Sequence, residues 1–84
     1  MHVERSFRGI SRRLAREYLV GLGGTEISDR RVEGEDWTAT LSTETVSVGP
    51  TLELTEVTVV FEGAEDRVET VVEEFSRKAM RAGG

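Results

Sequence analysis

The sequence predicts a single α+β domain over residues 1–84, in which an antiparallel sheet of about four strands carries two helices on one face. Three observations favour this fold class. Apolar residues recur at helical spacing in residues 10–22 and 64–81. Apolar and polar residues alternate in residues 37–42, as in a half-buried strand. The length of 84 residues leaves room for only one hydrophobic core.

The first strand is expected at residues 2–8 and the first helix at residues 10–22. The helix is predicted because its apolar residues recur every three or four positions while arginines occupy the opposite side. Gly23-Gly24 ends it, since glycine adopts the left-handed cap conformation without a Cβ clash. The apolar residues of this helix are Ile10, Leu14, Ala15, Tyr18, Leu19 and Leu22.

The middle of the chain reads as three strands. Residues 26–33 form a weakly patterned strand, and the polar turn at residues 33–36 leads into the alternating strand that begins at Trp37. A second hairpin follows across Gly49-Pro50-Thr51. With a helix at 64–81, the expected order is β-α-β-β-β-α.

The second hairpin has an unusual apolar pattern. If paired residue numbers sum to about 100, each apolar residue faces an apolar partner on the other strand. In both strands, however, the apolar residues switch from odd-numbered to even-numbered positions, near residues 44–45 in one strand and 55–56 in the other. Because neighbouring residues point to opposite faces, we expect a bulge or strong coil there. The distal arm then covers either a helix of the same chain or a partner protein. Its apolar residues are Val46, Val48, Leu52 and Leu54.

Charge is unevenly distributed along the chain. Residues 1–31 carry seven arginines and four acidic residues (+3), and residues 32–84 carry four basic and twelve acidic residues (−8), which gives the net charge of −5. Arg12 and Arg16 lie on the basic helix face, a candidate surface for RNA or an acidic protein, although such faces are more often simply solvated. An acidic chain with few aromatic residues is a poor nucleic-acid binder, so no nucleic-acid partner is expected. Ten arginines against a single lysine resemble the composition of proteins from salt-loving archaea.

Residues capable of catalysis are few. The chain has no cysteine and a single histidine, His2, so neither a nucleophilic triad nor a zinc site is expected. The acidic turn at residues 33–36 matches no calcium loop. We therefore expect no enzymatic activity and no cofactor. The absence of a long apolar run or a signal-peptide pattern predicts a cytoplasmic protein without a membrane partner.

The chain ends in Gly83-Gly84, and this pair has two interpretations. An extended diglycine carboxylate suits activation by ATP, because glycine offers no side chain to obstruct a narrow channel. Alternatively, the glycines only end the last helix, as Gly23-Gly24 ends the first. We favour the functional interpretation, with residues 82–84 as a flexible tail.

At these glycines the chain resembles the ubiquitin-like small archaeal modifiers and sulfur carriers, a group that includes the small subunit of molybdopterin synthase. The resemblance implies that an adenylating enzyme of the ubiquitin-activating type acts on Gly84, and that Gly83 precedes it in the tail. A thiocarboxylate, or an isopeptide bond to a lysine of a target protein, would then form. Lys78 is a candidate acceptor of such a modification.

A second resemblance covers nearly the whole chain, through "FRGISRRLAREYLVGLGG", "VEGEDWTATL", "VVFEG" and "EEFSRKAMRAGG". These segments are similar to a small domain that follows the molybdopterin-synthase small-subunit domain in some prokaryotic proteins. This resemblance implies an accessory binding domain linked to molybdopterin-cofactor biosynthesis, with an inert C-terminus. The chain departs from a ubiquitin-type β-grasp in two respects: a helix directly follows the first strand, and another helix runs almost into the final glycines.

Overall fold

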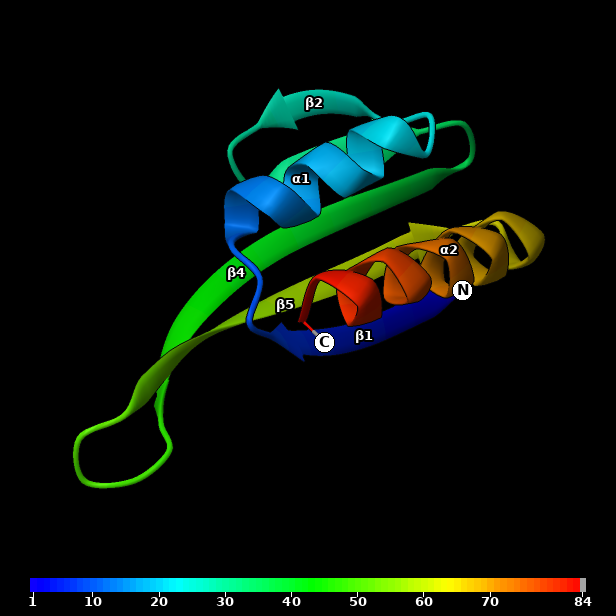
Figure 1. The fold of residues 1–84 in the computed structure, drawn as a ribbon. Helices are drawn as coiled ribbons and strands as arrows, with labels where there is room; N and C mark the ends of the chain where they lie inside the picture. Colours follow the sequence, from blue (N-terminus) through cyan, green and yellow to red (C-terminus); the bar gives the residue numbers. More distant parts are fainter. Residues whose placement is uncertain (84) are drawn as a thin grey trace.

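The computed structural model describes residues 1–83, with side chains described through Arg81. A single antiparallel sheet with the strand order β1-β5-β4-β3-β2 carries two helices, which lie over the same face (Figure 1). The α+β prediction is therefore confirmed. The elements are β1 (His2–Arg8), α1 (Arg12–Gly21), β2 (Thr25–Ser28), β3 (Arg31–Gly34), β4 (Trp37–Ser47), β5 (Glu53–Gly63) and α2 (Glu65–Gly83).

The sheet has five strands in place of about four, because the single strand expected at residues 26–33 is a short hairpin. Strands β2 and β3 pair antiparallel on either side of Asp29-Arg30. The Arg30 N–H donates to the Ser28 hydroxyl oxygen (3.3 Å), so a serine side chain helps to close the turn. No glycine or proline marks this turn, which explains why the sequence pattern reads as one strand.

The core lies between the helices and the inner face of the sheet. Phe75 of α2 is fully buried at its centre and makes edge-to-face contacts with three rings, namely Phe7 (5.0 Å between centroids), Phe61 (5.8 Å) and Tyr18 (6.2 Å). These contacts join β1, β5 and α1 to α2. The remaining buried apolar residues are Ile10, Ala15, Leu19, Val32, Trp37, Ala39, Leu41, Val57, Val59, Val68, Val71 and Ala79.

Helix α1 has defined signals at both ends. Ser11 caps its N-terminus by accepting the Leu14 N–H on its hydroxyl (3.0 Å), so the helix begins at Arg12, two residues later than expected. Its C-terminus is closed by Gly23, whose φ of 100° few other residues adopt. A Cβ on Gly24 would lie 2.4 Å from Val32 Cγ1, so this glycine also permits close packing on β3.

Helix α2 carries acidic residues in its first turn and Arg81 in its last, which complements the helix dipole at both ends. It extends through Gly83, two residues beyond the predicted end. Ala79 is its last residue buried in the core, and Met80 is 73% exposed. Among the residues whose side chains are described, the packing of α2 therefore ends before its final turn.

The long hairpin of β4 and β5 keeps one register throughout. Paired residue numbers sum to 100 from Trp37 with Gly63 to Ser47 with Glu53, as the apolar pairing predicts. Of the two expected alternatives, a bulge or a strong coil, the bulge is wrong, because this unbroken register leaves no extra residue in either strand. Odd-numbered residues such as Leu41 face the helices, and even-numbered residues such as Val46 lie on the opposite face, as strand alternation requires. The two strands twist about each other along the hairpin (Figure 1).

Candidate interaction site: the hairpin arm and the end of helix α2

We define the hairpin arm as residues 44–56, the part of the long hairpin that lies beyond the rest of the sheet. Pairing with β3 stops at Thr40, and pairing with β1 stops at Glu56. Figure 1 shows the arm projecting away from both helices. It accounts for the elongated shape of the molecule, whose longest dimension is 43 Å against 23 and 20 Å.

The four apolar residues predicted to form a surface all lie on this arm. Val46 and Leu54 face each other and are half-buried, whereas Val48 and Leu52 near the tip are 44% and 53% exposed. No helix of the described chain covers them, so the expectation that a helix of the same chain lies over these residues is wrong. By strand alternation they lie on the sheet face opposite the helices. An exposed apolar group of this kind is typical of a protein interaction site.

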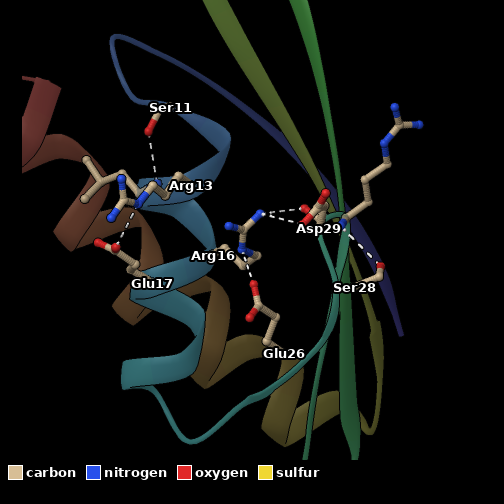
Figure 2. A network of polar contacts seen from close by, with 9 residues as sticks. Ser11, Arg13, Arg16, Glu17, Glu26, Ser28 and Asp29 are labelled. Atoms are coloured by element: carbon tan, nitrogen blue, oxygen red, sulfur yellow. Dashed lines mark hydrogen bonds and ion pairs between the residues drawn. The ribbon is translucent and has the colours of Figure 1, made fainter.

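Arg16 is occupied within the fold. It extends from α1 to β2, where its guanidinium forms an ion pair with Glu26 and donates to the Asp29 backbone carbonyl (3.0 Å), as Figure 2 shows. Its side chain is only 19% exposed. Arg16 therefore fastens the edge hairpin of β2 and β3 to α1, which is a structural role that the sequence did not indicate.

Arg12, in contrast, lies near the arm. It is half-buried and forms no ion pair with any described residue. Together with Gly9, Ser11, Glu53 and Leu54, it lines a shallow depression of about 320 Å³ where the start of α1 meets the root of the arm. The structure thus brings Arg12 and Leu54 together, although they are 42 positions apart in the sequence. It does not add Arg16 to this group.

The final glycines belong to a different part of the molecule. Gly83 is the last residue of α2, and Gly84 lies outside the described residues. Close to this end, the exposed Lys78 ammonium lies 5.9 Å from the centroid of the Tyr18 ring. Lys78, Arg77 and Arg81 also line a depression of about 350 Å³ beside the end of α1. Helix α2 therefore carries three basic residues, and one acidic residue, Glu74, around this depression on its way to the glycines.

A third depression, of about 490 Å³, lies near the polar turn between β3 and β4. Its lining includes the carboxylates of Glu33, Asp36 and Glu62. Within the described residues, no three side chains of the metal-ligating types are arranged to hold an ion. His2 lies near this end of the sheet, with its Nδ1 3.9 Å from a Glu62 carboxylate oxygen.

A comparison with known protein families matches residues 3–84 to the family described as archaeal MoaD-like protein. The chain belongs to this family. Family membership confirms the resemblance to small sulfur-carrier proteins and indicates a role related to ubiquitin-like and molybdopterin-linked chemistry. MoaD-like proteins generally work with activating enzymes and acceptors. No curated protein matches the chain.

The archaeal MoaD-like chain retains the two departures from a ubiquitin-type β-grasp that its sequence indicated. Helix α1 directly follows β1, and α2 is the last element before the final glycine. All neighbouring strands of the described sheet pair antiparallel. None of the helices in residues 1–83 has the length and apolar content needed to cross a membrane.

Proposed function

We propose that this archaeal MoaD-like protein is a ubiquitin-like modifier or sulfur carrier whose reactive group is the carboxylate of Gly84, in a chain that ends there. The observation that carries the proposal is the early end of the α2 packing. Among the side chains that the structure describes, Ala79 is the last of α2 buried in the core, and Met80 and Arg81 are exposed. The family match, which extends to residue 84, supports the same proposal.

The last turn of α2 has to unwind for Gly84 to enter an adenylating enzyme. Unwinding from Met80 removes no described side chain from the core, since Ala79 stays in place. The five residues 80–84 then reach about 17 Å when extended. Two of these residues are glycines, each of which favours the helix less than alanine by about 1 kcal/mol. The release therefore costs little, and helix ends fray readily.

The proposed chemistry needs no catalytic side chain from this protein. The Gly84 carboxylate attacks the α-phosphate of ATP and displaces pyrophosphate, which yields an acyl-adenylate on the activating enzyme. Hydrosulfide then displaces AMP to form a thiocarboxylate, or a lysine amine displaces AMP, loses a proton and forms an isopeptide bond. The protein acts as a substrate and carrier in both routes, and we do not propose that it is an enzyme.

The test is adenylation by a ubiquitin-activating-type enzyme from the same organism. The 84-residue protein is incubated with ATP, magnesium and the enzyme, and pyrophosphate release and the intact mass are measured with and without sulfide. We expect release and a thiocarboxylate with the unaltered chain, and neither product after deletion of Gly84. Gly21→Ala is the matched control, because a Cβ at Gly21 meets nothing within 4 Å. Unchanged release from the chain lacking Gly84 would refute the proposal.

A second candidate function is an accessory binding domain linked to molybdopterin-cofactor biosynthesis, with an inert C-terminus. It is favoured by the exposed apolar arm and by the continuation of α2 through Gly83. This candidate predicts that deletion of Gly84 leaves partner binding intact, whereas Leu52→Lys on the arm abolishes it. The two variants measured side by side therefore distinguish the two functions.

A further inference from the structure

On the hairpin arm, strand β4 has a free backbone edge. The Val48 N–H donates to the Leu52 carbonyl (2.8 Å), and the Leu41 N–H donates away from β5 to the Arg30 carbonyl (2.7 Å). Backbone groups alternate in direction along an antiparallel strand. Thr43, Thr45 and Ser47 therefore direct their N–H and C=O groups away from β5, beyond the point where β3 ends.

Most of the features that normally prevent a strand from pairing with another chain are missing from this edge, where Glu44 is the only charged residue in the sequence of residues 42–47. Residues 42–47 contain no proline, lysine or arginine, and the β4 register has no bulge. The other sheet edges differ. Strand β2 has only four residues, and β1 carries charged residues along its length. On the arm itself, the β5 edge is flanked by the segment from Gly9 to Arg12, which shares a depression with residues 53–55.

We propose that a second copy of this chain pairs with the first through the β4 edges of the two arms, antiparallel about a two-fold axis at Thr45. The outward-facing residues are symmetric about this position. Thr45 pairs with Thr45 of the second copy, and Thr43 pairs with Ser47 in both directions. Each outward-facing N–H then meets a carbonyl, so a single contact satisfies the whole free edge. The inference is independent of the chemistry at Gly84.

The apolar side chains of the arm match this arrangement. On the face opposite the helices, Val46 of each copy lies directly opposite Glu44 of the other copy and diagonally across from its Val46, a spacing that aliphatic side chains reach in antiparallel sheets. Val48 and Leu52 extend this apolar group on each arm and are substantially exposed in the single chain. Pairing therefore brings two small exposed apolar groups within diagonal reach of each other and removes part of their surface from water.

Glu53 near the tip of the arm and Arg30 beside its root carry complementary charges. Glu44 and Glu53 are exposed carboxylates on the arm. Arg30 is an exposed cation in the turn just before β3, and its backbone carbonyl accepts the Leu41 N–H of β4. Within residues 1–83, none of these three side chains forms an ion pair. A strand added at this edge continues the line of β3, so the tip of the second copy, with its Glu53, meets the turn that carries Arg30. This complementarity identifies a second copy as the occupant.

The test is sedimentation equilibrium of the full 84-residue chain over a wide range of concentrations. We expect a reversible monomer–dimer equilibrium. Thr45→Pro should weaken it by at least about tenfold, because proline removes an outward N–H while leaving the β4–β5 hydrogen bonds in place. Thr45→Val is the matched control, since it keeps the N–H and should dimerise like the unaltered chain. Circular dichroism verifies the fold of each variant.

A second variant keeps the inference testable if Thr45→Pro does not fold. Val46→Glu alters no backbone group and places a carboxylate directly opposite Glu44 of the second copy, so it should also weaken the dimer by about tenfold or more. A chain that remains monomeric at every concentration overturns the proposal. A dimer that survives Thr45→Pro or Val46→Glu in a folded variant overturns it as well, because its interface then lies elsewhere.

Discussion

The body of the domain and the hairpin arm share the strands β4 and β5 but differ in what covers them. In the body, α1 and α2 cover the inner face of the sheet, and Leu41 is 1% exposed. On the arm no helix is present, and Leu52 is 53% exposed. The same strand pairing thus produces a buried core at one end and an accessible apolar surface at the other.

This difference indicates that the two regions serve different purposes. Burial of apolar side chains is the main favourable contribution to folding, so the stability of the domain resides in the body. The arm contributes little burial, yet its side chains and free edge suit contact with another protein. Substitutions in the body should therefore change the free energy of unfolding, whereas substitutions on the arm should change association.

The largest effect is expected for Phe75→Ala in the body. It removes a fully buried ring that contacts three other aromatic side chains, and it leaves a cavity at the centre of the core. We expect the free energy of unfolding to fall by about 3–5 kcal/mol, measured by urea denaturation. Such a loss is a large share of the stability of a small domain. A change below about 1 kcal/mol would contradict the position of Phe75 in the core.

Gly63→Ala should have the second largest effect. Gly63 has a φ of 144°, and a Cβ there would lie 2.2 Å from the Asp36 carbonyl oxygen. Backbone has to move to accommodate it, so we expect a loss of about 1–3 kcal/mol in the same denaturation experiment. Gly21→Ala, which meets open space in α1, is the control and should cause no loss. Equal stabilities of the two variants would contradict the steric argument.

Ser11→Ala should have a moderate effect. It removes the hydroxyl that accepts the Leu14 N–H at the start of α1, and we expect a loss of about 1 kcal/mol by thermal or urea unfolding. The control on the arm is Ser47→Ala, where the serine is exposed and caps no helix. That variant should stay within about 0.5 kcal/mol of the unaltered chain. A larger loss at Ser47 than at Ser11 would reverse the comparison of the two regions.

The smallest effect on stability is expected for Leu52→Ala near the tip of the arm. Because Leu52 is largely exposed, truncation should change the free energy of unfolding by less than about 0.5 kcal/mol. Unfolding is measured at low protein concentration, so that dimerisation does not contribute. The same substitution at Leu41 is the matched control and should cost about 2–5 kcal/mol. Similar costs at both leucines would show that the arm tip is buried.

Much of the fold could be predicted from the sequence because its signals are local. The helical spacing of apolar residues located α1 and α2, and the matching of apolar pairs predicted the β4–β5 register. The β2–β3 hairpin was missed because Asp29-Arg30 carries neither glycine nor proline. The bulge was predicted wrongly because a switch of the apolar residues from odd to even positions has two possible causes. Either a residue is inserted in the strand, or a different face of the sheet is covered, and the sequence pattern does not distinguish them.

The candidate sites were less predictable because they depend on contacts between distant residues. Arg12 and Arg16 are equivalent in helical pattern, yet Arg16 is held by Glu26 and the Asp29 carbonyl while Arg12 lines a depression with Leu54. The free edge at Thr45 was also missed. The sequence predicts the β4–β5 register, which tells which residues of β4 face away from β5. These residues form a free edge only beyond the end of β3, whose length the structure supplied.

The sequence by itself determined the helices, the long hairpin with its register, and the presence of four apolar residues near the hairpin tip. These features depend on the periodicity of apolar side chains, which each segment carries within itself. Only the tertiary structure decided that the arm projects away from both helices, that Arg16 is occupied, and that Ala79 is the last of the described α2 side chains to be buried in the core. The reason is that exposure depends on which segments meet in space, and a periodic pattern does not specify its partner.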